Sequence, residues 1–335
     1  MSRMYSWMVM FWVIIGVQSV SSETDHNEKE HHALCEFLKV AVDKWKEVKA
    51  RKPEDPLRKA LKDTIFGYGG VEEDLETLKT TLPRDYDKVG EEGSSRSNWC
   101  GQPLSGEYQE SYPRWPGQSA PHDMVCLCTA GSHGWPINET GKLCAQGKDA
   151  LSARSQWWSG TNNTEKKDAI QKTWKIIVKQ CLSESIQKQD LKKTLQTFKD
   201  KIQRKIEETE TYYVLGENGT DYLSNPCDGS PKNGLCVKYY PTYKETQTWW
   251  KDLGEAIEKD EQLQKQRQEE TEEQKEEAEQ HSPKTEALNS GHPTTNQTEQ
   301  NRNDNITNQL RRFNLTSGTF ITPPSSWLLS ALLLI

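Results

Sequence analysis

The sequence predicts a mostly α-helical protein, an elongated antiparallel helical coiled-coil bundle with disulfide-rich loop lobes. Apolar residues recur in alternating steps of three and four along two long segments, which is the spacing of a coiled-coil seam. Stretches rich in Cys, Gly, Pro and Trp separate these segments. Only 33% of the 335 residues are apolar and the mean hydropathy is −0.91, so we expect an elongated shape, a long unfolded part, or both.

Residues 1–22 are predicted to form an export signal that is removed from the mature protein. Arg3 supplies a positive charge ahead of an apolar run at residues 7–17, and small residues lead up to a cleavage point after Ser22. The run is shorter than the roughly 20 apolar residues of a membrane-spanning helix. The alternative is that this segment is retained as an N-terminal anchor.

The folded domain is predicted to cover residues 23–263 and to open with a helical segment over residues 26–66. Pro53 and Pro56 interrupt this segment because proline does not fit a helix interior, and Gly67 ends it. The seam of the segment consists of Leu34, Leu38, Ala41, Trp45, Val48, Leu57, Leu61 and Ile65.

A second long helix is predicted from residue 165 to residue 213. Between residues 181 and 191 the register slips, as at the stutter of a coiled coil. At 1.5 Å per residue, its roughly 49 residues would form a rod of about 70 Å. An amphipathic rod of this length needs a partner, and the first helical segment supplies one. The seam residues are Ile170, Trp174, Ile177, Cys181, Leu191, Leu195, Phe198, Ile202 and Ile206.

Two loop-rich lobes, at residues 90–160 and 216–241, accompany the helices. Disulfides are expected to hold them, because short turns bury too little surface by themselves. A shorter helix follows, with apolar residues at Trp249, Trp250, Leu253, Ile257 and Leu263. After Leu263 apolar residues nearly vanish, so residues 264–317 are predicted to be a disordered, glycosylated stalk.

Eight cysteines in an exported chain predict disulfide bonds. Many pairings are possible, and the sequence does not choose among them. We expect only that Cys227 pairs with Cys236 across a turn-rich segment, and that Cys126 and Cys128 bond elsewhere, because one intervening residue would strain a mutual bridge. The eight are Cys35, Cys100, Cys126, Cys128, Cys144, Cys181, Cys227 and Cys236.

Six N-x-S/T sequons predict N-glycosylation at surface positions of an exported chain. They begin at Asn138, Asn162, Asn218, Asn296, Asn305 and Asn314.

Residues 327–335 are apolar and run to the last residue. A helix of that length cannot cross about 30 Å of hydrocarbon. Small residues, a short spacer and an apolar tail are typical of a GPI-attachment signal. Residues 318–335 are therefore predicted to be removed and Ser317 to carry the lipid, with Asn314 and Gly318 as competing attachment sites. The alternative is that the apolar C-terminus is buried in the fold.

The sequence contains no recognisable catalytic or cofactor-binding motif, so we expect neither catalysis nor a cofactor. Histidines near cysteines could supply metal ligands in two sets, but disulfide formation is the favoured interpretation for the cysteines. The twelve tryptophans are better explained by packing than by ligand binding, and a net charge of −7 argues against nucleic acid as a partner. The two sets are His31, His32 and Cys35, and His122, Cys126, Cys128 and His133.

The export signal, the helix pair, the Cys-rich middle, the polar stalk and the GPI-type tail together resemble the variant surface glycoproteins of African trypanosomes. The Cys126-Leu127-Cys128 step, preceded by Met124 and Val125, is similar to one in the B-type N-terminal domains of that family. The best-known members carry compact Cys-rich C-terminal domains, whereas no cysteine follows Cys236 here. This ending resembles the family branch with a short unstructured C-terminal region.

The resemblance implies a homodimer of elongated helical bundles that a GPI anchor holds on the outer face of the plasma membrane, with no small-molecule substrate. Packed side by side, such molecules form a coat that shields invariant proteins and presents a replaceable antigenic surface to host antibodies. The alternative is a related surface receptor that captures a host carrier protein, with an exposed apolar or aromatic patch expected between Trp99 and Trp158. A third class, an exported enzyme, lacks a catalytic constellation.

Overall fold

The computed structural model of the chain describes residues 23–280 apart from eight short segments, at 71–73, 92–93, 105–111, 161–164, 184–188, 208–209, 220–224 and 244–245. The chain divides into two units, residues 1–278 and 279–335, and all but the last two described residues belong to the first. The predicted export signal, the stalk from residue 281 onward and the GPI signal lie outside the described residues.

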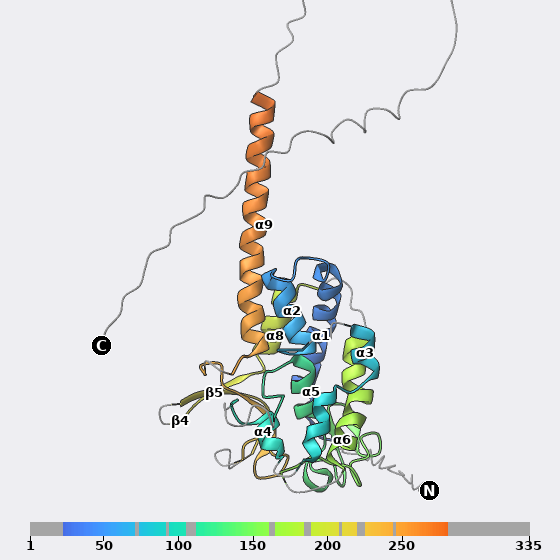
Figure 1. Cartoon of the computed structure of the whole chain (residues 1–335). Coiled ribbons are helices and arrows are strands. Elements are labelled where there is room, and N and C mark those ends of the chain that lie inside the picture. Colours follow the sequence, from blue (N-terminus) through green and yellow to red (C-terminus); the bar gives the residue numbers. More distant parts are fainter. Residues whose placement is uncertain are drawn as a thin grey trace, which may run out of the picture. The chain divides into compact units, whose positions relative to one another are not determined.

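The described part is about 53% helical, so the prediction of a mostly α-helical protein is confirmed. Helices and short helical turns alternate along the chain with two small sheets (Figure 1). The helical elements are α1 Glu28–Val48, α2 Pro56–Phe66, α3 Leu75–Thr80, η1 Arg84–Gly90, α4 Arg96–Cys100, α5 Ala120–Cys128, η2 Ser132–Gly134, α6 Lys166–Thr173, η3 Trp174–Val178, α7 Lys179–Ser183, α8 Leu191–Lys199 and α9 Trp249–Gln280.

The predicted helical segment over residues 26–66 forms two helices, α1 and α2, separated at the prolines. Asp55 caps α2, since its side chain accepts a hydrogen bond of 2.9 Å from the backbone N–H of Arg58. Pro56 occupies the first turn, where a missing N–H leaves no bond unmade. Both helices bury the predicted seam, and α1 also packs against α5, α7 and α8.

The predicted helix over residues 165–213 is wrong from residue 203 onward, where the chain forms strands. Residues 166–183 are helical through α6, the π-helical turn η3 and α7, and α8 follows as a separate helix. The chain then forms strands, and Ile206 is 65% exposed instead of lying on a seam. The β-branched and aromatic run at residues 211–214 favours a strand. The described residues therefore contain no single rod in this region, and the coiled-coil bundle expected from it is not confirmed.

Two three-stranded sheets join segments that are distant in the sequence. In the first sheet, ordered β1-β2-β3, the outer strand β1 is parallel to β2 and β2 is antiparallel to β3. The second sheet is antiparallel throughout, in the order β4-β5-β6, and every residue of β6 is buried. The strands are β1 Asp25–His26, β2 Lys142–Leu143, β3 Gln146–Gly147, β4 Gln203–Glu207, β5 Glu210–Asn218 and β6 Gly234–Tyr239.

Helix α9 corrects the prediction of disorder for residues 264–280. Its described side chains from residue 261 to residue 276 are all exposed, so burial does not hold this part helical. Glu, Gln, Lys and Arg are good helix formers, and ion pairs such as Lys265–Glu269 add local support. Among the described residues, no helix combines the length and apolar character that a membrane crossing requires.

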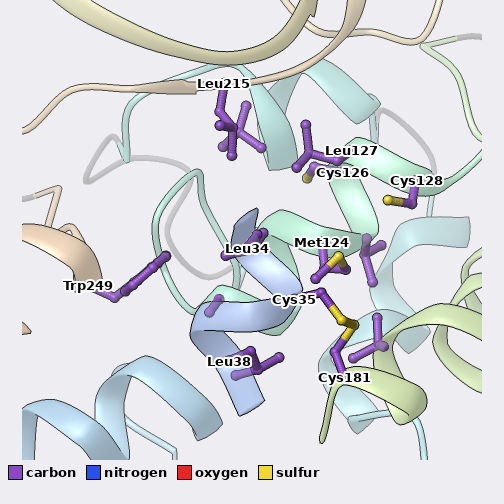
Figure 2. Close-up of a cluster of buried hydrophobic side chains, with 14 of the residues drawn as sticks. Leu34, Cys35, Leu38, Met124, Cys126, Leu127, Cys128, Cys181, Leu215 and Trp249 are labelled. Atoms are coloured by element: carbon purple, nitrogen blue, oxygen red, sulfur yellow. A yellow bond between two sulfur atoms is a disulfide. The ribbon is translucent and has the colours of Figure 1, made fainter. Parts of the chain in front are cut away.

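One hydrophobic core joins α1, α5, α7, α9 and the second sheet. Leu34 and Leu38 of α1 lie in it beside α5, with Leu215 of β5 at its edge (Figure 2). The ring of Trp249, at the start of α9, stacks on both Phe37 and Phe198, with each pair of ring centroids 5.0 Å apart. This stack anchors the first turn of α9 between α1 and α8.

Candidate functional site

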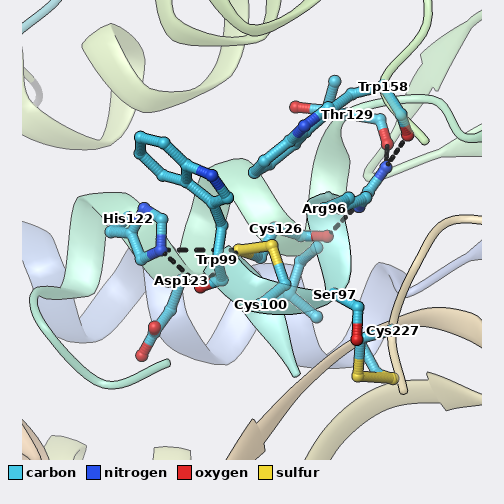
Figure 3. The surroundings of a disulfide bond; sticks show 12 residues. Arg96, Ser97, Trp99, Cys100, His122, Asp123, Cys126, Thr129, Trp158 and Cys227 are labelled. Carbon is cyan, nitrogen blue, oxygen red and sulfur yellow. Dashed lines mark hydrogen bonds between the residues drawn. A yellow bond between two sulfur atoms is a disulfide. The ribbon is translucent and has the colours of Figure 1, made fainter. Parts of the chain in front are cut away.

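All eight cysteines form disulfide bonds, which link the helices to one another and to the lobes. The predicted local pair is confirmed, and the two cysteines of the Cys-Leu-Cys step each bond to a different partner. One bond joins α1 to α7 (Figure 2) and another joins α4 to α5 (Figure 3). The four bonds are Cys35–Cys181, Cys100–Cys126, Cys128–Cys144 and Cys227–Cys236.

The first predicted histidine set has no thiolate to offer a metal ion. A ring nitrogen of His31 and the sulfur atoms of Cys35 and Cys181 lie within 4.8 Å of one another, a group that does not include His32. Both sulfur atoms are joined in a disulfide, whereas a cysteine binds metal as its thiolate. Burial lowers the pKa of His31 to about 4, so the ring beside this disulfide is neutral at physiological pH.

The second histidine set has a structural explanation as well. Nε2 of the buried His122 lies 2.9 Å from the carbonyl oxygen of Trp99, and its Nδ1 lies 2.8 Å from the hydroxyl of Tyr86. A carbonyl can only accept, so Nε2 carries the proton and Nδ1 accepts from the tyrosine. Burial lowers the pKa of His122 to about 3, which keeps this ring neutral. The two cysteines of the set are in disulfides, and His133 is exposed.

Asp123 is a buried carboxyl group that ties α5 to β6 and to the start of α9. One oxygen accepts hydrogen bonds from Nε1 of Trp249 at 2.7 Å and from the hydroxyl of Tyr239 at 2.9 Å. The other accepts from the backbone N–H of Gly117 at 2.9 Å. Burial raises the pKa of Asp123 to about 7, against the lowering effect of these bonds. Protein donors engage both oxygens, so this carboxyl group is a structural junction.

Arg96 forms a second polar junction, at the C-terminal end of α5. Its buried guanidinium donates to the carbonyl oxygens of Cys126 at 2.6 Å, Trp158 at 2.8 Å and Thr129 at 3.0 Å (Figure 3). Its Cζ also lies 5.0 Å from the centre of the Trp158 ring, which is a cation–π distance. Carbonyls at a helix C-terminus carry partial negative charge. Arg96 therefore fastens the end of α5 to the chain around residue 158.

Asn27 forms a third junction, which joins the start of α1 to α5 and to strands β5 and β6 of the second sheet. Its amide nitrogen donates to the carbonyl oxygens of Leu127 at 3.0 Å and Leu235 at 2.9 Å. Its amide oxygen accepts from the backbone N–H of Glu217 at 2.8 Å. The residue has a φ of 57°, a left-handed conformation that asparagine tolerates better than most residues. Sequence reasoning did not single out Asn27, Arg96 or Asp123.

Replacing Asn27 with glycine should lower the free energy of unfolding by about 3 kcal/mol, because three backbone groups, two of them in buried hydrogen bonds, lose their partner. Glycine accepts the left-handed backbone without strain, whereas alanine does not. We therefore expect Asn27→Ala to cost about 1 kcal/mol more than Asn27→Gly. Urea unfolding followed by circular dichroism measures both values, and equal stability of the wild type and Asn27→Gly would contradict the role of the side chain.

The tryptophans of the first lobe serve packing, as predicted. Trp99 and Trp158 are fully buried and Trp115 is 8% exposed, while Trp135 and Trp157 are half-buried. The large apolar side chains that are exposed in the described part of the chain lie elsewhere, at Ile206, Tyr243 and Leu263. The described residues between 99 and 158 thus do not form the exposed aromatic patch expected of a receptor.

Two of the six sequons begin within the described residues. Asn138 is exposed in the loop between η2 and β2, together with Glu139 and Thr140. Asn218 is half-buried as the last residue of β5. The other predicted modification sites lie outside the described residues: Asn162, Asn296, Asn305, Asn314, Ser317 and Gly318.

Comparison with known proteins gives one family. A family model described as the trypanosomal VSG domain matches residues 42–279. The match begins within α1 and ends one residue before the end of α9, so it covers nearly all of the described fold, including the exposed part of α9. A search of curated proteins finds no match.

Proposed function

The chain belongs to the trypanosomal VSG domain family, a family of surface coat glycoproteins, and from this premise we propose that it shields the parasite membrane and presents a variable antigenic surface. We further propose that it is exported, forms a homodimer and is held on the outer face of the plasma membrane by a GPI anchor. The observation that carries the proposal is the family match over residues 42–279.

The described fold suits a coat protein, whose function is to be exposed on the cell surface. Four disulfide bonds cross-link the helices and the lobes. Cross-links of this kind stabilise the folded structure of proteins outside the cell. The polar junctions at Asn27, Arg96 and Asp123 are buried, so they stabilise the interior without contributing chemistry at the surface. A GPI lipid with two acyl chains would give stable attachment, where a single chain binds only marginally.

The surface density of the protein tests the coat function against the receptor alternative. Quantitative mass spectrometry on intact parasites gives the copy number, and the membrane area gives the copies per unit area. We expect a density close to that of side-by-side packing. A sparse population confined to one region of the membrane would contradict the coat and favour the receptor.

We expect Asn138 to carry an N-linked glycan, because its sequon is exposed in a loop. Replacing Asn138 with glutamine, or Thr140 with alanine, should each remove one glycan, measured as the loss of one glycosidase-sensitive mass step. Thr140→Ser keeps the sequon and is the matched control, which should retain the glycan. An unmodified Asn138 peptide from the wild-type protein would show the expectation to be wrong.

A further inference from the structure

We propose that a pocket between the end of α2, helix α3 and the start of η1 binds a small amphipathic anion, a molecule with a flat apolar body and one acidic group. The pocket has a volume of about 650 Å³, which lies in the range of small-molecule sites. Its walls combine apolar side chains with a few charged groups at one end. The proposal does not depend on the coat function.

The apolar wall of the pocket is rigid. Phe66 and Leu78 line it and are 4% and 5% exposed, so they are fixed by the core behind them. The Tyr68 ring stacks on Trp115 with centroids 6.0 Å apart. The hydroxyl of Tyr68 also donates to Oδ2 of Asp252 in α9 at 2.7 Å. An aromatic or alicyclic body could therefore lie against side chains that do not need to be ordered on binding.

The charged end of the pocket has an excess of positive charge. Among the described residues, the charged ones that line it are Arg84, Arg114 and Asp85, two cations and one anion, which together carry a net charge of +1. Nε of Arg114 donates to Oδ2 of Asp85 at 3.1 Å, so these two charges balance each other. Arg84 is exposed, and the structure shows no ion pair for it within the described ranges. One acidic group on a ligand would balance this remaining charge.

The polar side of the pocket is held by hydrogen bonds within the protein. Oε1 of Gln118 accepts from Nη1 of Arg114 at 3.0 Å, and its Nε2 lies 3.4 Å from the carbonyl oxygen of Tyr68. Gln118 is 2% exposed. It fits because Gly67, with a φ of 99°, has no side chain; a Cβ at that position would lie 2.1 Å from Nε2 of Gln118. This close fit and the two hydrogen bonds hold the amide of Gln118 in place.

The test uses two fluorescent probes that differ in one group: anilinonaphthalene sulfonate, which is an amphipathic anion, and phenylnaphthylamine, its uncharged analogue. Thr81 lines the pocket and is exposed, so Thr81→Trp should block the pocket without disturbing the core. Thr80 is exposed but does not line it, which makes Thr80→Trp the matched control. Arg84→Gln removes the unbalanced charge. Each variant is used only after its thermal unfolding matches that of the wild type.

We expect the anionic probe to bind at one site per chain, and its affinity to fall at least tenfold in Thr81→Trp but not in Thr80→Trp. Arg84→Gln should weaken the anionic probe several-fold and leave the uncharged probe unchanged. Equal binding by Thr81→Trp and Thr80→Trp would place the probe elsewhere and overturn the proposal. Binding of the uncharged probe as tightly as the anionic one would overturn the assignment of ligand charge.

Discussion

Replacing Asp123 with alanine should lower the free energy of unfolding by about 4 kcal/mol near pH 6. The substitution leaves three buried donors without an acceptor, and each orphaned donor costs about 1–3 kcal/mol. These donors are Nε1 of Trp249, the hydroxyl of Tyr239 and the backbone N–H of Gly117. Because they come from α9, β6 and the loop before α5, we expect the unfolding to remain one cooperative transition at a lower urea concentration.

The matched control is Asp87→Ala. Asp87 forms an ion pair of 2.6 Å with Lys167, and both side chains are more than half exposed. Surface pairs contribute about 0–1 kcal/mol, so this variant should remain close to the wild type in stability. If Asp123→Ala lowered the free energy of unfolding no more than Asp87→Ala does, Asp123 would not stabilise the contact between α5 and α9.

The same carboxyl group should make stability depend on pH. Burial raises the folded pKa of Asp123 to about 7, above the usual unfolded value of about 4. Between these values the folded state holds a proton that the unfolded state has released, so the free energy of unfolding falls as the pH rises from about 4 to about 7. The buried histidines act in the opposite direction below about pH 6.5, because their folded pKa values are lowered.

Comparing the wild type with Asp123→Asn at each pH cancels the contribution of the histidines. We expect the stability of the wild type relative to Asp123→Asn to be greatest near pH 4 and to fall by up to about 4 kcal/mol by pH 8. A relative stability that stays constant over this interval would show that the carboxyl group does not take up a proton on folding.

Removing the Cys35–Cys181 bond by a double substitution to alanine should cost about 4 kcal/mol. The bond closes a loop between residues 146 positions apart, and long loops lose the most chain entropy when they are closed in the unfolded state. Cys100–Cys126 and Cys128–Cys144 lie inside that loop and shorten it, which keeps the expected loss below that of an unbranched loop. Urea unfolding without reductant measures the effect.

The comparison variant removes Cys227–Cys236, which spans only 9 positions. On the same reasoning its loss should be smaller, about 2.5 kcal/mol. If removing the short bond cost as much as removing the long one, loop closure would not be the main source of the stabilisation.

The elements that the sequence predicts well are those whose signal is local. The seam of α1 repeats every three or four residues, the two prolines mark its end, and Cys227 lies close to its partner Cys236 along the chain. Residues 203–213 were assigned to a helix because the spacing of Ile202 and Ile206 fits one. In the structure, residues 203–207 pair instead with residues 210–214 of the next strand, and only the later part of β5 pairs with the distant strand β6. The apolar spacing was given more weight than the β-branched and aromatic run at residues 211–214, which favours a strand.

The polar junctions were not predictable for a related reason. Asn27 and Leu235 are 208 positions apart, and Asp123 and Trp249 are 126 positions apart. For a single Asn or Asp, the sequence gives no signal that distinguishes a buried residue with several hydrogen bonds from a surface residue. The exposed half of α9 was missed because the absence of apolar residues predicts disorder, whereas the helical propensity of Glu, Gln, Lys and Arg extends a helix that is anchored by Trp249.

Release of the protein from intact parasites by a phosphatidylinositol-specific phospholipase C tests the anchored coat most directly. The account predicts that the enzyme frees most of the surface protein into the medium, and that the freed chain ends at residue 314, 317 or 318. A chain that stays on the cells after treatment, with its C-terminal peptide intact through Ile335 by mass spectrometry, would contradict the GPI anchor.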